Sequence, residues 1–105
     1  MAGPACGMLL ADLGADVIKV EKFPDGDDSR RMVPPKVDGE SAAYMILNRN
    51  KRGIVLDFNN PAALEVAREL IAKADVVVEN FSGGVMKKFG LDYASVSPTN
   101  PRLIY

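Results

Sequence analysis

A glycine turn is the first place where this sequence could bind a ligand. Ser82-Gly83-Gly84 stands between a run of valines and a short apolar segment. When such a turn joins a strand to a helix, backbone N–H groups are left free to bind a phosphate, and Lys87 and Lys88 would add positive charge. The turn matches neither a P-loop nor the dinucleotide-binding fingerprint. An ordinary turn beside a solvated basic face is therefore the alternative interpretation.

Two basic groups could also bind an anion. Residues 48–52, Asn-Arg-Asn-Lys-Arg, hold three cations within four residues, and arginine suits bidentate contact with phosphate. A solvated turn is the alternative. Arg30 and Arg31 form a weaker group because residues 25–28 contain three aspartates, which could neutralise them.

Three carboxylates, Glu21, Asp57 and Glu79, each close a segment that we predict to be a strand. In doubly wound sheets the strand ends line the ligand crevice, so each carboxylate could bind a ribose hydroxyl or cap the following turn. Capping is the simpler interpretation. Cys6 lies near a predicted helix start, but the chain contains no histidine to activate it. We therefore expect Cys6 to be a small packing residue.

Composition narrows the class of function. The 105 residues include 13 basic and 14 acidic side chains, so a general surface for nucleic acid is not expected. One cysteine excludes an internal disulfide and suits a cytoplasmic protein, with the mitochondrial matrix as the alternative. No apolar run reaches the ~18 residues of a membrane span, no secretory leader is visible, and no metal is expected without histidine.

Strands and helices alternate along the predicted chain. The predicted strands cover residues 16–21, 53–58, 76–78 and 102–105. The predicted helices cover residues 1–14, 42–47, 61–74 and 85–89, with a further helix or turn over 91–97 and irregular chain over 23–40. We expect Gly14 to end the first helix, Ser41 to cap the second, and Asn60 and Pro61 to begin the third. The third helix carries an apolar stripe that predicts its buried side: Ala63, Val66, Ala67, Leu70, Ile71 and Ala74. The run Val76-Val77-Val78 has no polar alternation, which predicts a central strand covered on both faces. The alternation predicts an α/β fold with a parallel sheet and helices on both faces.

Six segments together resemble the N-terminal region of the class III CoA-transferases, the group that contains formyl-CoA transferase, carnitine CoA-transferase and α-methylacyl-CoA racemase. They are Ala2–Cys6, Leu10–Glu21, Asn48–Arg52, Ala74–Phe81, Gly84–Met86 and Asn100–Tyr105. The resemblance implies a Rossmann-like fold in which residues 1–105 are the N-terminal part of the large CoA-binding domain, lacking an upstream strand and a downstream catalytic segment. It also implies an interlocked homodimer.

The same resemblance implies which residues contact coenzyme A. Matched by motif, they are Ala2, Lys22, Leu56, Asp57, Phe58, Asn59, Asn80, Phe81, Ser82 and Lys88. Family members often carry arginine where Lys22 and Lys88 stand, so a phosphate would meet a point charge rather than a fork. Many carry proline where Gly83 stands, which leaves this turn looser.

The resemblance implies an enzyme that moves CoA between carboxylic acids through an aspartyl-CoA intermediate. The partners implied are an acyl-CoA and a carboxylic acid. The aspartate nucleophile lies outside these residues, so we expect no catalytic residue in this chain and no activity from it alone. An α-methylacyl-CoA racemase fragment is the first alternative. A non-catalytic nucleotide-binding α/β module and a ligand-free structural piece are the others.

Overall fold

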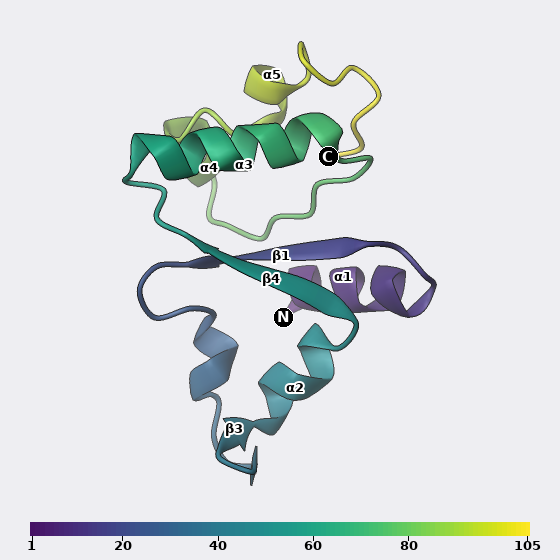
Figure 1. Ribbon diagram of the computed structural model, residues 1–105, viewed down its shortest axis with the longest axis vertical. Coiled ribbons are helices and arrows are strands. Elements are labelled where there is room, and N and C mark those ends of the chain that lie inside the picture. The colour runs from purple at the N-terminus through teal and green to yellow at the C-terminus, as the bar shows by residue number, and fades with distance from the viewer. The chain divides into compact units, whose positions relative to one another are not determined.

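The computed structural model describes residues 1–105, which form two compact units, Met1–Leu56 and Asp57–Tyr105 (Figure 1). The first unit contains α1 (Ala2–Asp12), β1 (Val17–Lys22), the 3-10 helix η1 (Asp28–Arg31), β2 (Lys36–Val37), β3 (Glu40–Ser41), α2 (Ala42–Asn48) and β4 (Lys51–Leu56). The second unit contains α3 (Pro61–Lys73), α4 (Val85–Lys88) and α5 (Tyr93–Val96).

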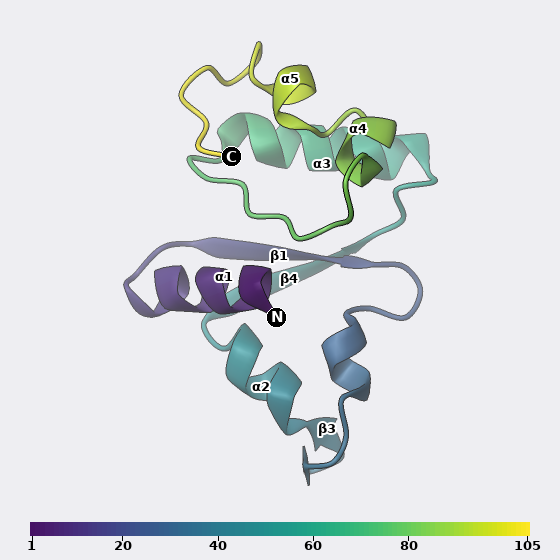
Figure 2. The same ribbon diagram turned by 180° about the vertical axis from the view of Figure 1, so that it is seen from behind.

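A parallel strand pair is the centre of the first unit. β1 and β4 run in register from Val17 opposite Lys51 to Lys22 opposite Leu56. Helix α1 contacts both strands and lies along them in Figure 2. A parallel pair joined through a helix is the arrangement expected of an α/β protein. The predicted α/β class with a parallel sheet is therefore confirmed.

Glycine ends α1 where the sequence predicts. Gly14 has a φ of +99°, a conformation that few residues other than glycine adopt. Its N–H donates to the Ala11 carbonyl at 3.0 Å, and the Ala15 N–H donates to the Leu10 carbonyl at 3.0 Å. This pair of bonds is a Schellman motif, which satisfies the last carbonyls of the helix and turns the chain into β1.

Residues 23–40, which we predicted to be irregular, contain more regular structure than expected. They include η1 and a two-residue antiparallel ladder between β2 and β3. The predicted cap of the following helix is confirmed, since the Ser41 Oγ accepts from the Tyr44 N–H at 3.3 Å. β4 begins at Lys51, two residues before the predicted strand, so Lys51 and Arg52 belong to the strand and not to the turn.

The second unit packs around α3. The Asn60 side chain accepts from the Ala62 N–H at 2.9 Å and Pro61 occupies the first turn, as predicted. The buried apolar side chains of this unit come from α3, α5 and the segments beside them: Ala67, Ile71, Leu91, Val96 and Leu103. Val66 was expected in this apolar core, but its side chain is 40% exposed.

The valine segment differs from the prediction. Only one isolated parallel bridge, Val76 to Ile104, is formed there, and the Val77 N–H donates to the Ile104 carbonyl at 2.8 Å. Val76 and Val78 are 41% and 44% exposed, so the predicted burial on both faces is wrong for this structure. The reason is that one short bridge provides a partner on a single edge and leaves the side chains uncovered.

None of the helices has the length and hydrophobicity that a transmembrane span requires.

Candidate functional site

Two predicted ligand contacts meet at the carboxyl end of the parallel pair. Lys22 and Leu56 are the last residues of β1 and β4 and lie opposite each other in register. Leu56 is buried and Lys22 is exposed. The Phe23 N–H donates to the Leu56 carbonyl at 3.3 Å and continues the ladder by one bond. Carboxyl ends of parallel strands are where α/β sheets bind ligands.

A buried carboxylate, Glu21, precedes Lys22 on β1. Glu21 is 5% exposed. Its oxygens accept from Arg30 Nε at 2.9 Å and Nη2 at 3.0 Å, from the Tyr44 hydroxyl at 2.7 Å and from the Asp27 N–H at 2.8 Å. We call Glu21, Arg30, Tyr44 and Asp27 the Glu21 cluster. Charge-assisted and bidentate bonds of this kind are the strong ones, so the cluster joins β1, η1 and α2.

The pKa values of Glu21 and Tyr44 agree with the hydrogen bonds of the Glu21 cluster. The hydrogen bonds from the Arg30 guanidinium outweigh the effect of burial and lower the pKa of Glu21 to about 2. Burial, and then the hydrogen bond to Glu21, raise the pKa of Tyr44 to about 12. Glu21 is therefore ionised and Tyr44 is a neutral donor at neutral pH.

Asp27 ties the same loop to β1 by a second route. Its carboxylate pairs with Lys19, and Lys19 Nζ also donates to Asn48 Oδ1 at 2.6 Å. The Ser29 N–H donates to Asp27 Oδ1 at 2.7 Å and opens η1. Burial raises the pKa of Asp27, but the bonds from Lys19 and Ser29 outweigh it and lower the pKa to about 2.

Gly26 allows the loop to approach the strand end. A Cβ placed on Gly26 would lie 2.6 Å from Glu21 Oε2, and the residue has a φ of +74°. The Gly26 N–H donates to the Lys22 carbonyl at 2.8 Å, which closes the turn after β1. Only glycine combines this backbone conformation with so close a contact.

Lys22 itself has an ion-pair partner within the chain. Its Nζ lies 2.6 Å from Asp28 Oδ1, and the two side chains are 57% and 72% exposed.

Three of the ten predicted contacts, Ala2, Lys22 and Leu56, lie in the first unit. Ala2 is the first residue of α1 and is exposed.

The basic residues 49–52 pair within the first unit. Arg49 lies 2.6 Å from Asp12, and Arg52 lies 2.6 Å from Asp16. Lys51 Nζ donates to one backbone carbonyl of α1 at 2.8 Å and to one of α2 at 2.6 Å, and burial lowers its pKa. Each cation thus joins segments of the chain, which supports a structural interpretation of this group over an anion site.

The seven other predicted contacts lie in the second unit. Asp57 accepts from the Asn59 N–H at 2.9 Å and from Asn59 Nδ2 at 3.1 Å, so it caps a turn. The Phe58 and Phe89 rings meet edge to face with centroids 5.4 Å apart, and Lys88 Nζ lies 5.5 Å from the Phe89 centroid. The structure therefore brings Phe58 and Lys88 to the same ring.

The remaining three predicted contacts form the chain before α4. Asn80 is exposed and Phe81 is 56% exposed. The Phe81 N–H donates to Glu79 Oε2 at 2.7 Å, so Glu79 also caps its turn. The Ser82 carbonyl accepts from the Val85 N–H at 3.2 Å, and Gly84, with a φ of +86°, opens the helix. The exposed ring of Phe81 is therefore an apolar surface in this segment.

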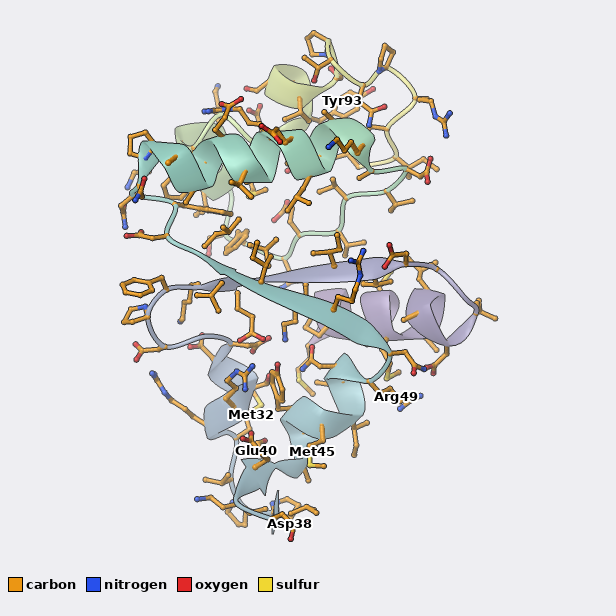
Figure 3. All side chains as sticks on the ribbon, viewed as in Figure 1. Met32, Asp38, Glu40, Met45, Arg49 and Tyr93 are labelled. Atoms are coloured by element: carbon orange, nitrogen blue, oxygen red, sulfur yellow. The ribbon has the colours of Figure 1, made fainter.

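An open hollow of about 420 Å³ was not predicted. It is lined by side chains of η1, β3 and α2 and of the residue after α2: Arg30, Glu40, Tyr44, Met45, Asn48 and Arg49. Figure 3 shows Glu40, Met45 and Arg49 on the same part of the first unit. Arg30 and Tyr44 are 14 residues apart in the chain, and no periodic pattern in the sequence indicates such a contact.

Cys6 was expected to be a small packing residue, but it is exposed.

These features define a class of protein. Parallel strands whose carboxyl ends lie side by side are typical of α/β proteins, which bind ligands at these strand ends. A family profile described as CoA-transferase family III matches residues 1–105. The chain belongs to CoA-transferase family III, and the resemblance stated from the sequence is confirmed.

Individual relatives agree with the family. The succinate–glutarate CoA-transferase of Agrobacterium fabrum is 50% identical over 111 residues, covering 100% of this chain and 28% of that protein. The human succinyl-CoA:glutarate CoA-transferase is 43% identical over 105 residues, with coverages of 100% and 24%. The formyl-CoA:oxalate CoA-transferase of Afipia carboxidovorans is 44% identical over 103 residues, with coverages of 98% and 24%.

A solved structure agrees with the fold. The crystal structure of a CAIB/BAIF family protein from Brucella suis matches with a TM-score of 0.92 and 50% identity, covering 100% of this chain and 29% of that one. The chain spans about a quarter of the length of the curated relatives it matches. It therefore corresponds to one part of a larger fold.

Proposed function

We propose that the complete protein moves CoA between two carboxylic acids and that residues 1–105 supply part of its CoA-binding domain. The observation that carries this proposal is the match to CoA-transferase family III over residues 1–105. The relatives named for CoA transfer act on succinate, glutarate, mesaconate, formate and oxalate groups, all of them small carboxylic acids or their CoA esters. A short-chain acyl-CoA and a dicarboxylic acid are the substrates that we propose.

The predicted contacts have distinct tasks in this proposal. Lys22 and Lys88 donate to CoA phosphates, because an ammonium group offers three donors and a full charge. The exposed ring of Phe81 offers an apolar surface. Lys22 and Leu56 lie together at a strand end, which supports their assignment. Ala2, Asp57, Phe58, Asn59, Asn80 and Ser82 complete the proposed contacts.

The chemistry that we propose is covalent catalysis by a carboxylate. An aspartate outside residues 1–105 attacks the acyl thioester, giving an acyl anhydride and CoA thiolate. The thiolate then attacks the aspartyl carbonyl, which gives aspartyl-CoA and releases the donor acid. The acceptor acid is converted to its CoA ester by the same two steps in reverse. We further propose a cytoplasmic homodimer.

Activity of the full-length protein tests the proposal. Incubation with succinyl-CoA and a panel of dicarboxylic acids should yield succinate and the CoA ester of at least one acceptor in equal amounts. The 105-residue polypeptide alone should yield none. Exchange of an α-deuterium from a branched acyl-CoA, with no transfer of CoA to any acid, would replace this proposal with the racemase alternative.

A further inference from the structure

The loop that follows β1 places an aspartate on the lysine that we assign to CoA. Lys22 Nζ lies 2.6 Å from Asp28 Oδ1. A carboxylate in contact with an ammonium group weakens the attraction of that ammonium group for another anion. A phosphate that approaches Lys22 therefore competes with a partner that the chain already carries.

Surface ion pairs are usually weak because two flexible side chains must be ordered. Asp28 differs because the residues on both sides of it are anchored. The Asp27 N–H donates to Glu21 Oε2 at 2.8 Å, the Ser29 N–H donates to Asp27 Oδ1 at 2.7 Å, and Arg30 pairs with Glu21 at 2.9 Å. The backbone at Asp28 is thus already ordered when its side chain meets Lys22.

The turn also fixes the other end of the pair. The Gly26 N–H donates to the Lys22 carbonyl at 2.8 Å, and Lys22 is in register with Leu56 in the strand ladder. Both backbone segments that carry the ion pair are therefore held by hydrogen bonds. The pair can therefore open by rotation of a side chain, with no movement of the backbone.

We propose that Asp28 is an internal counter-ion that lowers the affinity of Lys22 for CoA phosphate, and that the Glu21 cluster holds it there. This inference rests on the proposed function, because it takes Lys22 as a CoA contact. It makes Asp28 a residue that sets affinity without touching CoA. Ligands with a dense negative charge, such as the phosphates of CoA, open the pair more readily than a single carboxylate does.

Calorimetric titration of the full-length protein with CoA tests this inference. Asp28→Asn frees Lys22 and should lower the Kd about two- to fivefold, the range expected for removing one exposed ion-pair partner. The effect should shrink as ionic strength rises, since exposed charges are screened. An unchanged or higher Kd for this variant would overturn the inference.

A matched control separates the contact from the general charge of the loop. Asp25 carries the same charge in the same loop but pairs with Arg31 at 3.0 Å. Asp25→Asn should therefore leave the Kd within about 1.5-fold of the starting protein, because its partner is not Lys22. Equal gains from both variants would show a general electrostatic effect and overturn the inference.

A double-mutant cycle links the gain to Lys22. Lys22→Gln should raise the Kd, and Asp28→Asn should then give no gain in the Lys22→Gln background. If Lys22→Gln raises the Kd and Asp28→Asn has no effect alone, only the counter-ion inference fails. If CoA binds but Lys22→Gln leaves the Kd unchanged, the assignment of Lys22 fails with it. If the full-length protein neither binds nor transfers CoA, the proposed function fails.

The role of the Glu21 cluster has its own test. Glu21→Gln removes the charge that pairs with Arg30, so the backbone at Asp28 is held less firmly. The gain from Asp28→Asn should then be at most half as large, on a logarithmic scale, as in the starting protein. A full gain in the Glu21→Gln background would show that the cluster does not hold Asp28.

Discussion

The two units bury different kinds of side chain. In the first unit, three polar residues are buried among a few small or aliphatic ones. The side chains of Glu21 and Ser41 are hydrogen-bonded, and Ser29 bonds through its backbone N–H while its hydroxyl has no partner. In the second unit, Asn100 is the buried polar residue, and the other buried side chains come from apolar residues such as Ile71 and Leu91. The first unit is therefore held by directional bonds that specify a loop, and the second by apolar contacts that specify a helix face.

Polar bonding and apolar packing respond differently to the substitution of one side chain and to pH. A buried ion pair loses much of its effect when one partner is neutralised, and it depends on pH. An apolar core loses stability with the volume removed and has no titrating group. Variants that separate these responses test whether the two units really differ.

The largest expected effect is in the second unit. Leu91 is 1% exposed, and Leu91→Ala should lower the free energy of unfolding by about 4 kcal/mol, because it leaves a cavity in the core. Urea unfolding of the full-length protein measures this. Leu13→Ala, at a side chain that is 86% exposed, is the control and should cost less than about 0.5 kcal/mol. Equal costs for the two variants would contradict the apolar core.

The next effect is in the first unit. Glu21→Gln should lower the free energy of unfolding by about 3 kcal/mol, because the buried carboxylate loses the charge-assisted bonds that it accepts from Arg30 and Tyr44. Asp16→Asn is the matched control, since Arg52 also makes two bonds to Asp16, at 2.9 and 2.6 Å, but this pair is exposed. The control should cost about 0–1 kcal/mol. Similar losses in urea unfolding would show that burial is not what distinguishes Glu21.

Acid should erase the effect of Glu21. The pKa of Glu21 is lowered from 4.5 to about 2, so its contribution is full above pH 4.5 and is lost as pH falls towards 2. A shift of this size corresponds to about 3 kcal/mol. The stability difference between the starting protein and Glu21→Gln should therefore shrink across that window. The deficit of Leu91→Ala should stay constant there, and a deficit that shrinks equally in both variants would remove the contrast.

The smallest effect concerns the buried polar residue of the second unit. Asn100 Nδ2 donates to the Ile71 carbonyl at 3.0 Å and to the Ala74 carbonyl at 2.7 Å, which satisfies the end of α3. Asn100→Ala should cost about 2 kcal/mol in urea unfolding, because one buried and one half-buried carbonyl lose their donor. Asn59→Ala, in an exposed turn, should cost less than about 1 kcal/mol. A negligible cost at Asn100 would mean that water replaces the amide.

Local signals explain what the sequence could predict. Gly14, Ser41, Asn60 and Pro61 act within four residues of their own position, and each ends or begins a helix as expected. The apolar stripe of α3 was partly correct for the same reason. The segments that resemble the family identified it correctly, because each motif could be read without knowing which residues meet in space.

Contacts between distant residues explain what the sequence could not predict. Glu21 and Tyr44 are 23 residues apart, and the loop between them has no hydrophobic period. Arg30 was considered a weak candidate for anion contact, yet it forms an ion pair with Glu21. The valine run had the composition of a central strand, but whether it is covered depends on neighbours that composition does not reveal. The ten predicted CoA contacts stay predictions.

Gly26 carries a consequence for anyone who redesigns this protein. Its backbone conformation and the 2.6 Å approach to Glu21 leave no space for a side chain. A library that varies every position from Phe23 to Arg31 should return functional clones with free choice at the loop surface but with glycine alone at position 26. Deleting Gly26 would remove the hydrogen bond that closes the turn after β1 and would displace the aspartates that follow it.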